Sequence, residues 1–140
     1  MKKLISLFLV FSMVFCAMSF ASAEDAQYRV AMITDSGDIT DQSFNQTTYE
    51  ACKAFCEANG LDFNYFKPTG DSDAERAAQI EAAIDEGYNV IVLPGYLFAA
   101  AIAECQPAYP EVEFIALDVS EYDLTSPEGG NIADVAACDN

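Results

Sequence analysis

From Tyr28 onward, short apolar runs alternate with stretches in which apolar residues recur every three or four positions. The short runs are bounded by Gly, Pro, Asp or Asn, a pattern that predicts strands. The periodicity between them predicts amphipathic helices, each with one buried face. The predicted strands cover residues 28–34, 61–66, 89–93, 112–117 and 131–136. The predicted helices cover residues 43–59, 72–86 and 96–107, and residues 119–130 are predicted to form a polar loop.

Strands that alternate with single helices predict an α/β fold, in which a parallel sheet carries helices on both faces and the crossovers are right-handed. The third predicted strand, 89–93, is a continuous and mostly β-branched run, as expected for a central strand buried on both faces. In the common order for such a chain, the first strand lies between the second and the third. A ligand site is then expected beyond the carboxyl ends of the first and third strands.

Capping residues mark the helix starts. Ser43 and Gln46 have capping-box spacing before the first helix, with Asp41 as an alternative cap one turn earlier. Ser72 and Glu75 have the same spacing before the second helix. The apolar stripe that we expect the first helix to bury comprises Phe44, Thr48, Ala51, Cys52, Phe55 and Cys56.

The start of the chain has the pattern of an export signal rather than of folded structure. A basic start precedes an apolar stretch at 4–20, and residues 21–23 (Ala-Ser-Ala) match a cleavage site, so 24–140 is the predicted mature domain. The alternative is a lipoprotein acylated at Cys16, which the bulky Phe15 before it disfavours. Both interpretations place the protein outside the cytoplasm, in the periplasm or on the outer face of the cytoplasmic membrane.

The composition is strongly acidic, with 23 acidic against six basic residues and a formal net charge of −17. Nucleic acid is therefore not expected as a partner, since binding a polyanion requires clustered Lys or Arg. A neutral or cationic small ligand is favoured over a phosphate-rich one. The chain has no histidine, which removes the usual general base and weakens most hydrolase interpretations.

The cysteines outside the export signal are expected to be small packing residues, although disulfides with three possible connectivities remain open. They are Cys52, Cys56, Cys105 and Cys138. No metal or cofactor is expected. A zinc site is not expected, because the sequence has no histidine and no Cys-x-x-Cys motif. Asp38 and Asp41 lack the spacing of an EF-hand calcium loop, and the sequence has no glycine-rich phosphate-binding motif.

Three strand ends are predicted to meet at one edge of the sheet: residues 35–37, 94–96 and 118–119. Asp35 and Asp118 can accept hydrogen bonds from the vicinal hydroxyls of a sugar. Phe44 offers a flat face for stacking, and Gly95 permits close approach. Each residue also has a structural interpretation: a turn or cap for the aspartates, core packing for Phe44, and chain reversal at Gly95.

The same carboxylates leave a second function open. Asp35 and Asp118 would form the acid–base pair of an exported α/β enzyme that acts on a sugar or nucleoside, if the pKa of one of them were raised. A third possibility is a structural lobe that binds nothing.

Four runs resemble, in the same order, the basic membrane protein family, the purine-nucleoside-receptor-like substrate-binding proteins of ABC transporters. They are Ala31-Met32-Ile33-Thr34-Asp35, Asp41-Gln42-Ser43-Phe44-Asn45, Leu93-Pro94-Gly95-Tyr96-Leu97-Phe98 and Phe114-Ile115-Ala116-Leu117-Asp118. The resemblance extends from Tyr28 to Ala136. It implies one lobe of a type I periplasmic-binding-protein fold, a nucleoside-like ligand held between two lobes, an ABC permease as partner and no catalysis.

The resemblance also implies roles for individual residues. Asp35 and Asp118 resemble polar ligand contacts, Phe44 resembles the residue that stacks on the base, and Gly95 and Tyr96 line the cleft; their expected neighbours are Ser36, Gln42 and Asn45. Members of the family are substantially longer than this chain. We therefore expect residues 24–140 to be an incomplete N-terminal lobe without its second lobe, and a half-cleft to bind its ligand weakly.

Overall fold

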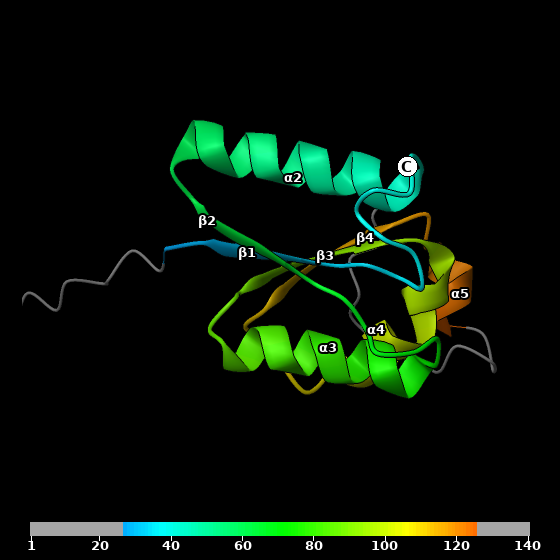
Figure 1. The fold of residues 1–140 in the computed structure, drawn as a ribbon. Helices are drawn as coiled ribbons and strands as arrows, with labels where there is room; N and C mark the ends of the chain where they lie inside the picture. The colour runs from blue at the N-terminus through cyan, green and yellow to red at the C-terminus, as the bar shows by residue number, and fades with distance from the viewer. Residues whose placement is uncertain (1–26, 126–140) are drawn as a thin grey trace, which may run out of the picture.

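The computed structural model describes residues 27–125. Its elements in chain order are β1 (Arg29–Ile33), α2 (Phe44–Asn59), β2 (Asp62–Phe66), α3 (Asp73–Asp85), β3 (Val90–Pro94), the 3-10 helix η2 (Tyr96–Phe98), α4 (Ala99–Cys105), β4 (Glu113–Leu117) and α5 (Glu121–Thr125). The sheet is the middle one of three layers, with α2 on one face and α3 and α4 on the other (Figure 1). The predicted α/β fold is confirmed.

The described strands form one parallel sheet in the order β2-β1-β3-β4. In its register, β1 pairs with β2 from Arg29 opposite Asp62 to Ile33 opposite Phe66. On the other side β1 pairs with β3, and β3 with β4. The predicted position of the first strand between the second and third is thus confirmed, and the carboxyl ends of all four strands point to the same edge.

The alternation of side chains along β1 divides the core between two faces. Ala31 and Ile33 point toward α3 and α4, where Ile80 and Phe98 are also fully buried. Val30 and Met32 point toward α2 and pack in a smaller cluster. Burial of one Ile or Leu side chain contributes about 1.5–3 kcal/mol, so the larger cluster on the α3 face provides most of the stability.

The α2 face of the sheet is only partly covered. Right-handed crossovers from β2 to β3 and from β3 to β4 both place their helices on the opposite face, which leaves α2 beside an open apolar groove of about 460 Å³. Ile115 of β4 is exposed along this groove. The predicted burial of the α2 stripe is therefore wrong in part: Thr48 and Cys56 are buried, whereas Ala51 and Phe55 remain exposed.

The helix ends follow two different capping arrangements. Ser72 and Glu75 form the predicted capping box. The Ser43 side chain makes no such bond; instead Asp41 Oδ1 accepts from the Ser43 and Gln46 backbone N–H groups at 2.8 and 3.3 Å. The capping box predicted for α2 is thus wrong, and the alternative cap at Asp41 is correct.

The other differences lie near chain reversals. Pro94 still belongs to β3, and the third predicted helix divides into η2 and α4, ending at Cys105. Part of the predicted polar loop forms α5, whose start is capped by the Ser120 hydroxyl group. Other predictions lie outside the described residues: the export signal and Cys16, the remainder of the polar loop, the fifth strand 131–136 and Cys138.

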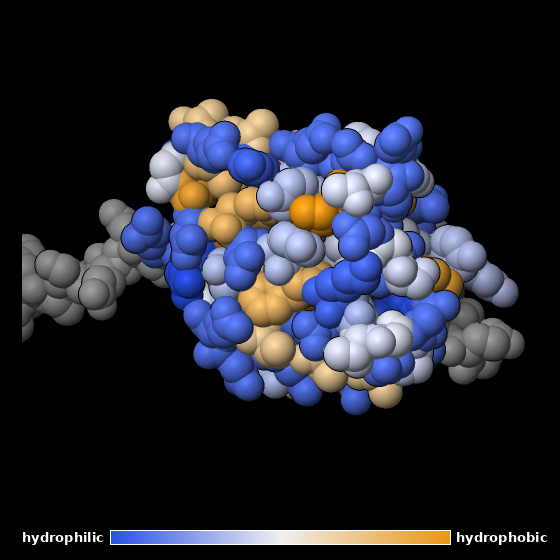
Figure 2. Space-filling view, viewed as in Figure 1, coloured by the Kyte–Doolittle hydropathy of each residue, from blue (hydrophilic) through white to orange (hydrophobic). Residues whose placement is uncertain are grey.

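Hydrophilic side chains predominate on the face of the molecule shown in Figure 2, with apolar patches over the layer between α2 and the sheet. Among residues 27–125, no helix is long and apolar enough to cross a membrane. Cys52, Cys56 and Cys105 are free thiols. Cys56 and Cys105 are buried, which agrees with their interpretation as packing residues.

Candidate functional site

The loops that follow β1, β3 and β4 adjoin one another at the carboxyl edge of the sheet; we call their residues 35–37, 94–96 and 118–119 the rim. The Gly95 N–H donates to the Leu117 carbonyl oxygen at 2.9 Å and so joins the loop after β3 to the end of β4. Gly95 has a φ of 117°, which a side chain would oppose, and a Cβ there would lie 3.9 Å from Asp35 Oδ2. The structure therefore brings Asp35 and Gly95 together at the switch point.

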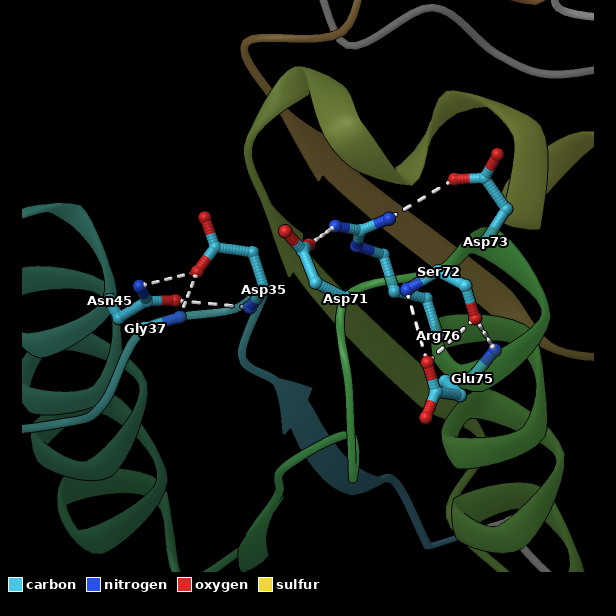
Figure 3. A network of polar contacts seen from close by, with 8 residues as sticks. All are labelled: Asp35, Gly37, Asn45, Asp71, Ser72, Asp73, Glu75 and Arg76. Atoms are coloured by element: carbon cyan, nitrogen blue, oxygen red, sulfur yellow. Dashed lines mark hydrogen bonds and ion pairs between the residues drawn. The ribbon is translucent and has the colours of Figure 1, made fainter.

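One oxygen of the Asp35 carboxylate is fixed by the protein. Asp35 Oδ1 accepts from Asn45 Nδ2 at 2.8 Å and from the Gly37 N–H at 2.7 Å (Figure 3). Asp35 Oδ2 accepts no hydrogen bond from residues 27–125. An oriented carboxylate with a free oxygen beside a glycine can receive the hydroxyl or amine donor of a ligand.

Asn45 supports this carboxylate from within α2. Its side chain is buried, and its Nδ2 also donates to Asp41 Oδ2 at 2.9 Å. This bond from Asn45 holds the pKa of the Asp41 carboxyl group below its usual range, with smaller contributions from backbone N–H groups. A Cβ on Gly37 would clash with Asn45 Nδ2, so the loop approaches α2 as closely as a glycine allows. Asn45 is thus placed to orient other side chains.

The two predicted aromatic residues are exposed. Phe44, the first residue of α2, is 43% exposed and lines the groove together with Val92 and Leu117. The core interpretation that the sequence left open for Phe44 is therefore not supported within the described residues. Tyr96 is 63% exposed in η2, next to Gly95. Both rings are free to contact a ligand.

Two predicted site residues have a left-handed backbone. Gln42 has a φ of 55° and Asp118 a φ of 58°. This conformation costs a non-glycine residue about 1–2 kcal/mol, and such strain is concentrated at functional sites. The Gln42 N–H donates to Gln46 Oε1 at 2.9 Å, while the Asp118 and Ser36 side chains are exposed.

The sequence interpretation missed Arg76 and Asp71, at the start of α3 and in the loop before it. Arg76 is 3% exposed, and its guanidinium group forms ion pairs with Asp71 and Asp73. A signal was present, because position 76 lies one helical turn before Ile80 on the stripe that α3 buries. A basic residue at an apolar stripe position indicates a buried charge.

Residues 27–125 contain no group of three His, Cys, Asp or Glu side chains that is arranged to hold a metal ion. The rim instead offers carboxylates, backbone amides and aromatic rings, which suit an organic ligand with hydroxyl groups and a flat ring.

Comparison with protein families gives one match across most of the chain. A family model described as ABC transporter substrate-binding protein PnrA-like matches residues 28–134. This family consists of solute-binding proteins rather than enzymes.

Curated relatives agree with this match. A CD4+ T-cell-stimulating antigen of Listeria monocytogenes is 31% identical over 96 residues, which are 65% of this chain and 26% of the relative. The ABC transporter nucleoside-binding protein BmpA of Lactococcus lactis is 24% identical over 110 residues, 76% of this chain and 31% of the relative. An uncharacterized lipoprotein of Pyrococcus abyssi is 26% identical over 68% of this chain and 23% of its own. The chain spans about a quarter to a third of the length of these relatives.

Solved structures of ABC transporter solute-binding proteins have the same fold. The protein from Aeropyrum pernix K1 matches with a TM-score of 0.59 and 29% identity, over 66% of this chain and 25% of its own. The protein from Conexibacter woesei matches with a TM-score of 0.55 and 25% identity, over 62% of this chain and 28% of its own.

Proposed function

The chain belongs to the family of PnrA-like substrate-binding proteins of ABC transporters, and from this premise we propose that it binds a purine nucleoside or a similar small ligand at the rim. The resemblance indicated by the sequence motifs is confirmed. Because the family consists of binding proteins, the alternative enzyme with an acid–base pair of Asp35 and Asp118 is not supported.

The observation that carries the proposal is the arrangement of Asp35. Its Oδ1 is held by Asn45 and by the Gly37 N–H, so the orientation of the carboxylate is set before any ligand arrives. Its Oδ2 accepts no hydrogen bond from residues 27–125 and lies close to Gly95. Binding to a preorganised acceptor of this kind loses little conformational entropy, since the carboxylate needs no reorientation.

The rest of the ligand would extend over exposed side chains. Asp118 would accept a second hydroxyl donor, and Phe44 or Tyr96 would stack on the base. Ser36 and Gln42 would adjoin the ligand, and Asn45 would act through Asp35. The net charge of −17 favours a nucleoside over its phosphorylated forms, because phosphate groups would be repelled.

The family match also supports a proposal for the cellular context. We propose that residues 1–23 direct export and that residues 24–140 form the N-terminal ligand-binding lobe of a two-lobed receptor. Such a receptor would work outside the cytoplasm, in the periplasm or at the outer face of the membrane, and deliver its ligand to an ABC permease. The relative named BmpA is itself described as nucleoside-binding, which supports the choice of ligand.

Calorimetric titration with inosine and adenosine tests this function. We expect saturable binding of both without release of free base, and weaker binding in Phe44→Ala and Asp118→Ala. Phe55→Ala is the matched control, since Phe55 is an exposed ring on the same helix but about three turns away from Phe44. Failure of the wild-type chain to bind either nucleoside would contradict the proposal, as would release of free base or ribose.

A further inference from the structure

Arg76 is an unusual residue to bury. Only 3% of its surface is exposed, although both of its ion-pair partners are at the surface: Asp71 is 64% and Asp73 61% exposed as side chains. Asp73 Oδ1 accepts from Arg76 Nη1 at 3.1 Å, and Asp71 Oδ1 accepts from Nη2. The guanidinium group thus holds two carboxylates that belong to the loop and first turn after β2.

Stability alone gives no reason for this arrangement. A buried charge loses its hydration, and the attraction within a buried ion pair commonly does no more than offset this desolvation penalty. The Nε–H of Arg76 also finds no hydrogen-bond acceptor among residues 27–125. A buried donor without a partner costs about 1–3 kcal/mol, so an apolar side chain of similar length would serve the core at least as well. What Arg76 does provide is a fixed orientation for its two partners.

The orientation of Asp71 is the relevant one for the rim. Strand β2 pairs directly with β1, so the loop after β2 begins beside the loop after β1 at the same edge of the sheet. In Figure 3 the Asp71 side chain lies between Asp35 and the guanidinium group of Arg76. Asp73 lies on the opposite side of that group. Asp71 Oδ2, like Asp35 Oδ2, accepts no hydrogen bond within the described part of the chain.

We propose that Arg76 is a positioning residue of the rim, which holds the Asp71 carboxylate toward that of Asp35 so that both receive hydrogen-bond donors of one ligand. This inference rests on the proposed function and adds the loop after β2 to the site. Two carboxylates that face one ligand repel each other when the site is empty. A sugar hydroxyl pair or an amine relieves that repulsion by donating to both, which makes such donors the chemistry that this side of the rim selects.

Asp71 and Asp73 form a matched pair for the test, since both are exposed partners of Arg76 and only Asp71 lies on the side of Asp35. In titrations with inosine, Asp71→Asn should weaken binding about tenfold, the loss expected for one charge-assisted hydrogen bond. Asp73→Asn should leave the affinity within about twofold of wild type, since it removes only a partner of Arg76. Equal effects of the two substitutions, or none from Asp71→Asn, would overturn the proposal.

A second comparison separates positioning from general support. If Arg76 acts through Asp71, the double variant Arg76→Met/Asp71→Asn should bind inosine no more weakly than Asp71→Asn alone. Additive losses would show that Arg76 acts in another way and would overturn its positioning role. Should Arg76→Met fail to fold, the comparison of Asp71→Asn with Asp73→Asn still decides the matter.

A wild-type chain that binds no inosine would overturn the proposed function and leave the placement of Asp71 to be judged without ligand. In thermal unfolding of the free protein, repulsion between neighbouring carboxylates is removed by either Asp35→Asn or Asp71→Asn. The double variant should therefore gain less than the sum of the two single variants. The pair Asp35→Asn and Asp73→Asn should be additive. Additivity in both pairs would contradict the placement of Asp71 beside Asp35.

Discussion

Asn45 Nδ2 donates to Asp35 Oδ1 at 2.8 Å, and this bond joins the first turn of α2 to the loop after β1. The Asp35 N–H donates back to Asn45 Oδ1 at 3.3 Å, so the two residues are joined in both directions. Because Asn45 is buried, its position is set by the packing of α2 on the sheet. The orientation of a rim carboxylate therefore depends on the same contacts that stabilise the fold.

Replacing Asn45 should affect stability and binding together. Asn45→Ala leaves Asp35 and Asp41 without their side-chain donor, and we expect a loss of about 1–3 kcal/mol in the free energy of unfolding, measured in urea. Inosine binding should weaken as well, since Asp35 is no longer held. Asn59→Ala is the control: Asn59 is exposed, and within the described part of the chain its side chain bonds only the Phe55 carbonyl oxygen of its own helix. Similar losses in both variants would argue against a special role for Asn45.

Substitutions of Asp118 should change the stability of the protein and its affinity for ligand independently. Asp118→Gly removes the carboxylate and relieves a left-handed backbone, whereas Asp118→Ala removes the carboxylate and keeps the strain. We expect the Gly variant to be about 1 kcal/mol more stable than the Ala variant in urea unfolding. Both should bind inosine equally weakly. If either variant retains wild-type affinity, the Asp118 carboxylate is not a ligand contact.

The architecture was predictable from the sequence because its signals are local and repeated. Continuous apolar runs and three-to-four periodicity located the strands and helices, and the common strand order of such folds then placed β1 between β2 and β3. The cap of α2 was harder to predict, since Ser43 and Asp41 both have suitable side chains. Only the loop geometry decides that Asp41 bonds the backbone N–H groups. The exposure of Phe55 could not be predicted, because periodicity marks an apolar face without showing what covers it.

The dependence of stability on acidic pH tests the cap that Asp41 provides at the start of α2. Hydrogen bonds, first that from Asn45 and then those from the Ser43 and Gln46 N–H groups, lower the pKa of this carboxyl group in the folded state. The unfolded state then takes up the proton first, so the stabilisation is present above the ordinary Asp pKa of 3.8 and is lost as the pH falls through the lower folded value. Asp41→Asn should therefore lose less stability than wild type between pH 5 and 2, measured by urea unfolding at each pH. Parallel curves for both proteins would contradict this cap.

The thiols should react slowly in the folded protein. Burial raises the pKa of Cys52 to about 11 and that of Cys105 to about 12, so almost no thiolate is present at pH 8. We expect mass spectrometry to show little alkylation of Cys52 and Cys105 by iodoacetamide without urea and complete alkylation of both with it. Cys105, which lies in the core of the α3 face, should be the more protected of the two. Rapid modification of Cys105 in the native protein would show that this core opens easily.

The candidate site was predictable in its location and less so in its chemistry. Asp35 and Gly95 follow adjacent strands of a parallel sheet, so their proximity follows from topology. The sequence could not show that Asn45 orients Asp35 while Asp35 would face the ligand, because these roles depend on which of the two side chains is buried. Arg76 was overlooked since a basic residue in an acidic chain suggests a solvated surface, and only its burial identifies it as a support for Asp71.

The most direct test of nucleoside binding at the rim is an NMR titration of the isotope-labelled protein with inosine, in which each backbone amide is followed. We predict saturable shifts in residues 35–37, 95–96 and 118–119, and much smaller shifts along the α2 groove near Ala51 and Ile115. Shifts confined to the groove, or no shifts at millimolar inosine, would contradict the account.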